Sequence, residues 1–238
     1  MIGIDVDSDL FSWWLPYYKS LKLDSYTAYL HSSLDEDLNE GSKRLFQEYG
    51  FTVVMLPEGV VRDNAIRCNE PGIGVRSFLF DALALTFPKE DFLVTADGDE
   101  IQEWPENPRA YVERGIRIVI GEHVDCFDET LHAPDTEKTL DENYPLRYNN
   151  LSTLWRPYDD PYNPRKICLA PVRYPVDYSG SHDVKKEYML AAPRALASGI
   201  LNVLHYRWRQ SAFLRVKNRP NWPEHEQKFI KNFFSVAE

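Results

Sequence analysis

Three carboxylates and a glycine stand together in the sequence Asp97-Gly98-Asp99-Glu100, called the acidic loop below. Only a glycine separates Asp97 from Asp99, so the two side chains can approach each other with little bulk between them. Adjacent carboxylates repel one another, and Mg²⁺ or Mn²⁺ relieves that repulsion because these ions prefer oxygen ligands and share them with substrate phosphates. A bound ion of this kind also neutralises charge on a departing diphosphate. The alternative for so short an acidic motif is a solvated turn.

The segments before the acidic loop predict how it is positioned. An apolar run at Asp91–Thr95 predicts a strand that leads directly into it. Upstream, strand patterns alternate with helix patterns: strands are expected at Ile2–Val6, Ser25–Leu30 and Phe51–Leu56, and helices at Asp9–Leu21, Asp35–Tyr49 and Val75–Phe87. This alternation predicts an α/β fold with a mainly parallel sheet flanked by helices. Ligands of such sheets bind beyond the carboxyl ends of the strands, where the acidic loop is expected.

The second half of the chain alternates less regularly. Its expected elements are a helix at Pro105–Glu113, strands at Arg117–Gly121 and Ile167–Val172, a loop-rich stretch at Asp128–Pro175, and helices at Gln210–Lys217 and Glu224–Phe234. No internal repeat or linker divides the sequence, so residues 1–238 are expected to form a single domain.

Composition limits the partners and the location of the protein. The formal net charge of −10 disfavours a nucleic-acid partner, which usually requires a basic face. No apolar stretch approaches the roughly 20 residues that span a bilayer, and no signal peptide is recognised, so no transmembrane segment is expected. The three cysteines, Cys68, Cys126 and Cys168, are odd in number and far apart, which predicts a reducing, cytoplasmic location.

Five segments resemble motifs of one family. Asp91–Glu100, a strand followed by Asp-Gly-Asp-Glu, resembles the signature of family 2-like glycosyltransferases with the GT-A fold. Similar motifs of one subgroup follow the same order at Phe11–Tyr26, Gly121–Cys126, Gly180–His182 and His205–Trp208. The resemblance implies a GT-A (Rossmann-like nucleotide-diphospho-sugar transferase) fold. Residues 1–104 would then form the nucleotide-sugar-binding half, and 105–238 the acceptor-binding half with the C-terminal helices.

The same resemblance implies a reaction. A sugar would move from a nucleotide-diphosphate donor to a glycan or other hydroxyl acceptor, with Mn²⁺ or Mg²⁺ as cofactor and with inversion at the anomeric carbon. An inverting transfer needs a general base for the acceptor hydroxyl, for which Asp125 is the first candidate and Asp183 the second. Neutral imidazole is a suitable third metal ligand.

The implied site residues form three groups. The metal ligands would be Asp97, Asp99 and His205. The donor would be bound by Asp5, Asp7, Arg67, Arg76, Asp97, His182 and Arg207, with Arg209 also near the diphosphate. Asp99 is expected to contact the metal directly, Asp97 the ribose or the edge of the metal site, and Glu100 to support both. For each histidine and arginine, a structural or surface role is the alternative.

The chain departs from the motifs of the subgroup at two places, and two other functions remain possible interpretations of the sequence. The chain has Asp5–Ser8 where the subgroup often has Arg-Asn-Glu, and His31–Ser33 where an Asn or Asp contact is usual, which leaves the donor base open. A nucleotidyltransferase of related fold and a catalytically inactive sugar-binding module are the alternatives.

Overall fold

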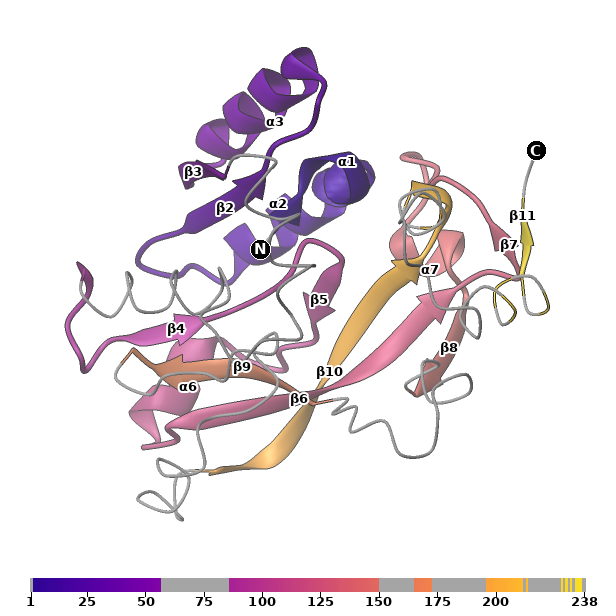
Figure 1. Ribbon diagram of the computed structural model, residues 1–238. Helices are drawn as coiled ribbons and strands as arrows, with labels where there is room; N and C mark the ends of the chain where they lie inside the picture. The colour runs from indigo at the N-terminus through magenta and orange to yellow at the C-terminus, as the bar shows by residue number, and fades with distance from the viewer. Residues whose placement is uncertain are drawn as a thin grey trace.

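The computed structural model describes residues 2–56, 86–149, 165–172, 196–211, 213, 228, 230, 232 and 234–236. In these ranges the protein is a mixed α/β fold with a three-stranded sheet, a six-stranded sheet and a small two-stranded sheet (Figure 1). Nearly all of the expected helix at Val75–Phe87 and most of the two expected C-terminal helices lie outside the described residues. The same holds for four expected site residues, Arg67, Arg76, His182 and Asp183.

The N-terminal sheet is parallel, as the sequence predicts. Its strands are β1 (Ile2–Gly3), β2 (Thr27–His31) and β3 (Thr52–Leu56), in the order β1-β2-β3. Ile2 pairs with Leu30, and β2 pairs with β3 along its whole length. The predictions of strands at Ser25–Leu30 and Phe51–Leu56 are confirmed.

Two helices connect these strands, and both were predicted. Helix α2 (Phe11–Ser20) continues through Pro16, and α3 (Glu36–Glu48) begins where the Asp35 side chain accepts a hydrogen bond from the Leu38 N–H (3.1 Å). A helix N-terminus leaves such N–H groups without backbone acceptors, so an aspartate at this position stabilises α3. Gly50, with φ of 77°, follows α3 in the left-handed conformation that favours glycine.

The expected strand at Ile2–Val6 is wrong in its second half. The chain turns after Gly3 into α1 (Ile4–Asp7) and the 3₁₀ helix η1 (Ser8–Leu10). The turn has a local cause, because the Asp7 carboxylate accepts a hydrogen bond from the Gly3 N–H at 2.8 Å. The apolar run is explained by burial of Ile4 and Val6 in this helical turn rather than in a strand.

The larger sheet is mixed, which corrects the prediction of a mainly parallel sheet. Its strands are β4 (Phe92–Val94), β5 (Glu100–Gln102), β6 (Ile118–Phe127), β8 (Leu146–Asn149), β9 (Arg165–Pro171) and β10 (Leu196–Trp208). The order is β4-β9-β6-β10-β5, with β8 pairing β6. The β6–β10 pair is parallel, and the β4–β9, β9–β6, β10–β5 and β8–β6 pairs are antiparallel. The strand–helix alternation predicts parallel strands up to β4, but β4 joins the mixed sheet and pairs antiparallel with β9. The alternation ends there and gives no information on the strands that follow.

Four short elements complete the described fold. Helix α6 (Pro108–Glu113) begins after Asn107, whose side chain accepts from the Arg109 N–H (2.9 Å), within the expected helix at Pro105–Glu113. The stretch expected to be loop-rich also contains β7 (Thr130–Leu131) and α7 (Leu140–Asn143). Strand β11 (Ser235–Val236) pairs with β7. Among the described helices, none has the length and apolar character needed to cross a membrane.

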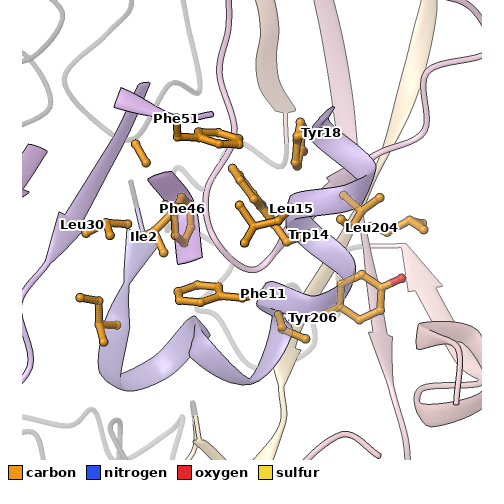
Figure 2. Packing of buried hydrophobic residues seen from close by; sticks show 14 of the residues in the cluster. Ile2, Phe11, Trp14, Leu15, Tyr18, Leu30, Phe46, Phe51, Leu204 and Tyr206 are labelled. Carbon is orange, nitrogen blue, oxygen red and sulfur yellow. The ribbon is translucent and has the colours of Figure 1, made fainter. Parts of the chain in front are cut away.

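A large apolar cluster joins the mixed sheet to the N-terminal layer, which consists of β1, β2 and β3 with helices α2 and α3 (Figure 2). Phe11, Trp14 and Leu15 of α2 lie at its centre, and the Phe11 and Phe46 rings meet edge to face with centroids 4.9 Å apart. Tyr206 of β10 belongs to the same cluster. Burial of apolar surface of this kind is the main stabilising contribution to folding, so α2 is held firmly between the two sheets.

Candidate active site

Helix α2 and strand β10 hold the backbone of the acidic loop. The Trp14 indole donates to the Asp97 carbonyl (2.9 Å), and the Tyr18 hydroxyl donates to the Glu100 carbonyl (3.0 Å). Trp14 and Tyr18 are four residues apart and therefore share one face of α2. On the other side, the Tyr206 N–H donates to the Asp99 carbonyl (2.8 Å). Three backbone carbonyls of the loop are thus anchored, which leaves its carboxylates to determine the chemistry.

Gly98 permits a close approach between the acidic loop and α1. A Cβ atom at this position would lie 2.5 Å from Asp7 Oδ2 and 2.9 Å from Asp7 Cβ. Real Cβ atoms do not approach other atoms this closely, so any larger residue would displace Asp7. The glycine between the two aspartates is therefore required by packing as well as by spacing.

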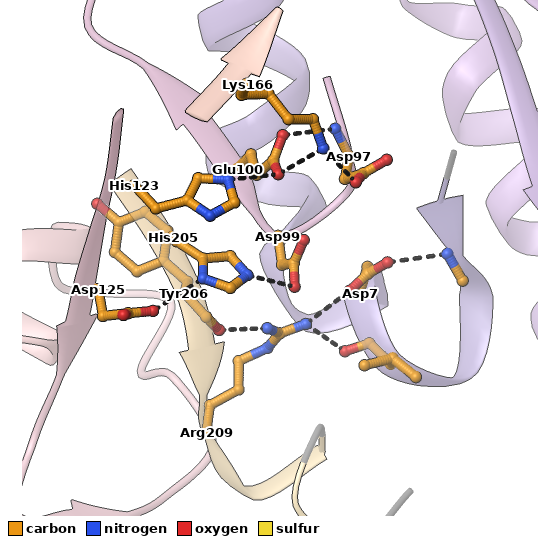
Figure 3. A network of polar contacts seen from close by, with 12 residues as sticks. Asp7, Asp97, Asp99, Glu100, His123, Asp125, Lys166, His205, Tyr206 and Arg209 are labelled. Carbon is orange, nitrogen blue, oxygen red and sulfur yellow. Dashed lines mark hydrogen bonds and ion pairs between the residues drawn. The ribbon is translucent and has the colours of Figure 1, made fainter. Parts of the chain in front are cut away.

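Asp99, His205 and Asp125 form a continuous chain of polar contacts (Figure 3). His205 Nε2 lies 3.4 Å from Asp99 Oδ2, and His205 Nδ1 lies 2.8 Å from Asp125 Oδ1. His205 and Asp125 are directly paired across β10 and β6. Burial opposes protonation of His205, but the two carboxylates raise the pKa of its imidazole to about 10. Burial also opposes ionisation of Asp99, yet His205 and Arg209 hold the pKa of this carboxyl below its usual value.

Lys166 of β9 provides a second cation, on the side of the acidic loop opposite His205 (Figure 3). Its Nζ lies 2.6 Å from Asp97 Oδ2 and 2.8 Å from Glu100 Oε1, and the side chain is 2% exposed. His123 Nε2 is 3.2 Å from Glu100 Oε1, and the His123 ring stacks on His205 with centroids 4.7 Å apart. Burial would raise the pKa of Glu100, but Lys166 lowers it to about 2.

Arg209 is the third cation, and it is fully buried just after β10. Its guanidinium donates to the carboxylates of Asp7 (2.8 Å) and Asp9 (3.0 Å) and to the carbonyls of Val6 and Tyr206. Burial and the nearby Asp99 raise the pKa of Asp7 to about 6, although Arg209 acts in the opposite direction. Arg209 therefore fixes the turn after β1 beside the acidic loop.

The structure brings together seven of the expected site residues: Asp7, Asp97, Asp99, Glu100, Asp125, His205 and Arg209. Asp5 does not join them, because its side chain is exposed on α1. Arg207 is half-buried with its guanidinium over the Trp208 ring, 5.4 Å from the centroid, and Arg209 is the arginine that contacts the site carboxylates.

Sequence reasoning missed Lys166 and His123. A signal for the lysine exists, since Lys166 directly precedes the apolar run Ile167–Ala170. A lysine buried in such a strand requires carboxylate partners, and the acidic loop supplies them.

The chemistry of the donor atoms fits a divalent ion at Asp99 and His205. A carboxylate oxygen and an imidazole nitrogen lie 3.4 Å apart, and Mg²⁺ is typically held by one or two carboxylates together with phosphates and water. The Asp97 carboxylate instead contacts Lys166. In the described part of the chain, no group of three His, Cys, Asp or Glu side chains is arranged to hold a metal. Among the described residues, Asp99 and His205 are the two side chains that could hold the ion.

A cavity of about 470 Å³ lies on the Lys166 side of the acidic loop. Trp14, Tyr26, Phe51 and Phe92 contribute aromatic walls, and Asp97 lies at its polar end. The cavity is lined by residues 25–29 at the amino end of β2 and by residues 94–97 at the carboxyl end of β4. Its volume is within the range of small-molecule sites.

Comparison with known proteins adds no family assignment. No protein-family model matches this chain, and no curated protein shows significant sequence similarity to it. Functional inference therefore depends on the geometry of the site.

Proposed function

We propose that this chain is a GT-A type glycosyltransferase that moves a sugar from a nucleotide-diphosphate donor to a hydroxyl acceptor with the help of Mn²⁺ or Mg²⁺. The observation that carries the proposal is the contact between Asp99 Oδ2 and His205 Nε2 at 3.4 Å. These residues are 106 positions apart, and they are the two for which the motif resemblance implies direct metal contact. The contact between Asp99, in the loop after β4, and His205 supports a metal site over a solvated turn.

Each contact in the site has a role in this proposal. A metal bound by Asp99 and His205 supplies positive charge to the departing diphosphate. Asp125 accepts the hydrogen bond from His205 Nδ1, which directs Nε2 toward Asp99. Arg209 holds Asp7 against the glycine of the loop. We assign the cavity beside Asp97 to the nucleoside of the donor, since Asp97 is the expected ribose contact.

The geometry favours a positioning role for Asp125. Its side chain is 1% exposed and hydrogen-bonded to His205, so an acceptor hydroxyl would have to displace that contact to transfer a proton to it. Asp183, the second candidate for the base, lies outside the described residues and stays a proposal. We also propose a cytoplasmic location, in keeping with the free, buried thiols of Cys126 and Cys168.

A donor panel tests the function. The protein is mixed with UDP-, GDP-, CDP- and dTDP-sugars, with and without Mn²⁺, and thermal unfolding and nucleoside diphosphate release are measured. We expect at least one donor to raise the Tm only when Mn²⁺ is present, because an ion held by Asp99 and His205 would supply the positive charge that the diphosphate requires. Asp99→Asn should remove that shift, and Asp141→Asn, at an exposed carboxylate paired with Arg147, should leave it unchanged.

The same assay separates the rival functions. Release of pyrophosphate from a nucleoside triphosphate and a sugar phosphate would indicate a nucleotidyltransferase. Protection by free sugars without nucleotide dependence would indicate a sugar-binding module. Absence of protection by every donor would refute the glycosyltransferase proposal.

A further inference from the structure

Asp97 and Asp99 belong to one motif, but they face different cations. Asp97 Oδ2 is 2.6 Å from the ammonium of Lys166, whereas Asp99 Oδ2 is 3.4 Å from an imidazole nitrogen. Asp97 is thus in a close ion pair with an ammonium group that also contacts Glu100, whereas Asp99 has a longer contact with an imidazole nitrogen, an atom type that commonly binds metals. The two aspartates are therefore unequal toward a divalent ion.

The contact with Lys166 is difficult to break. Lys166 is 2% exposed, and Glu100, its second carboxylate partner, is equally buried. Removing one member of a buried ion pair leaves an uncompensated charge away from water, which is strongly unfavourable. The Asp97 N–H also donates to Glu100 Oε2 (3.1 Å), which ties Asp97 to the same group. A divalent ion that required Asp97 would have to compete with this arrangement.

We propose that Lys166 is a positioning residue that withholds Asp97 from the divalent metal, so that the ion is held by Asp99 and His205 and enters together with the diphosphate. The inference rests on the proposed function and adds an order of binding to it. Two protein ligands hold an ion weakly, and the oxygens of a nucleoside diphosphate complete its coordination. Metal and nucleotide should therefore increase each other's affinity by the same factor, as thermodynamic linkage requires.

Mn²⁺ binding tests the role of Lys166 without measuring turnover. Free Mn²⁺ is followed by electron paramagnetic resonance during titration of the full chain, first with the metal alone and then with UDP or GDP present. Lys166→Met should raise the affinity for Mn²⁺ alone by about tenfold, because Asp97 becomes available as a third ligand. Lys138→Met, at an exposed lysine 3.8 Å from Asp135, serves as the control and should have no effect.

A double variant distinguishes two effects of Lys166→Met: the release of the Asp97 carboxylate and the loss of a positive charge near the ion. If Lys166→Met acts by freeing Asp97, then Lys166→Met with Asp97→Asn should return to the affinity of the original protein. If the double variant keeps the gain, the effect is long-range electrostatics and the inference is overturned.

Two single variants decide the matter if Lys166→Met does not fold. Asp97→Asn should change the Mn²⁺ affinity by less than about threefold, and Asp99→Asn should lower it by more than about tenfold. Equal losses in both variants, or no Mn²⁺ binding by any variant, would overturn the inference.

These outcomes are distinct from failure of the proposed function. If Asp97→Asn and Asp99→Asn differ in Mn²⁺ affinity but no nucleotide binds, the role of Lys166 stands and the glycosyltransferase proposal fails. If a nucleotide-sugar protects the protein but the two variants lose Mn²⁺ affinity equally, the glycosyltransferase proposal stands and the role of Lys166 fails.

Discussion

Asp125 and His205 face each other across the parallel strands β6 and β10, with Asp125 Oδ1 2.8 Å from His205 Nδ1. Because the two residues are paired in the sheet, the register of β6 and β10 sets their alignment. The hydrogen bond fixes the imidazole ring so that Nε2 faces Asp99. A carboxylate behind a histidine in this way is typical of histidines that bind metals.

The first prediction concerns this contact. Asp125→Asn keeps the size of the side chain but removes its charge, so it should weaken Mn²⁺ binding in the presence of a nucleoside diphosphate by about 10- to 100-fold. Calorimetric titration of the folded variant measures the loss, with Asp141→Asn as the exposed control. Unchanged affinity in Asp125→Asn would show that the contact serves only the fold.

The second prediction concerns the pH dependence of stability. The two carboxylates raise the pKa of His205 in the fold to about 10, against 6.5 for an ordinary histidine, despite its burial. A raised pKa means that the imidazolium stabilises the fold fully below pH 6.5, and that this contribution is lost as the pH rises through about 10. With a chelator present, urea unfolding of the original protein and of His205→Asn should therefore differ most at the acidic end of this window. A difference that stays constant across it would contradict the assignment.

The third prediction concerns Gly98. Gly98→Ala should reduce the free energy of unfolding by about 1–3 kcal/mol, because the new methyl group would displace Asp7 from the acidic loop. Gly41→Ala is the matched control, since a Cβ at this position in α3 meets nothing within 4 Å. That substitution should stabilise the protein by about 0.5–1 kcal/mol, as expected for alanine in a helix interior. Urea unfolding should give opposite signs for the two variants, and equal signs would show that the close approach at Gly98 is absent in solution.

The fourth prediction concerns Arg209. Arg209→Met should cost about 3–5 kcal/mol of unfolding free energy, because Asp7 would remain buried without its cation. Arg109→Met removes an exposed ion pair with Asp24 and should cost no more than about 1 kcal/mol. Chemical denaturation of both variants measures the contrast. A small loss for Arg209→Met would mean that Asp7 is readily protonated or hydrated when the arginine is absent.

The sequence predicts the N-terminal layer well because its signals are local. The amphipathic pattern of α2, the capping aspartate of α3 and the short apolar runs of β2 and β3 each occupy one segment. The acidic loop was placed after β4 for the same reason. Apart from α1, which replaces the second half of the strand expected at Ile2–Val6, the expected and observed elements agree here to within a few residues.

The larger sheet was not predictable in the same way. Strand β6 is buried along nearly its whole length, so it has no alternation from which its face or direction can be read. Lys166 lies just outside the strand expected at Ile167–Val172, and nothing in its neighbours indicates that it contacts Asp97 across 69 positions. Long-range pairings determine both features, and local patterns do not contain them.

The order of charges along the chain has a consequence for how the protein is made. The site carboxylates of α1, η1 and the acidic loop are synthesised first, and the cations that contact them follow at Lys166, His205 and Arg209. A nascent chain that ends near residue 104 would contain mutually repelling carboxylates without these counter-charges. The contacts of the acidic loop with His205 and Arg209 can therefore form only after β10 has left the ribosome and paired with β6, so an isolated first half would lack the counter-charges of this cluster.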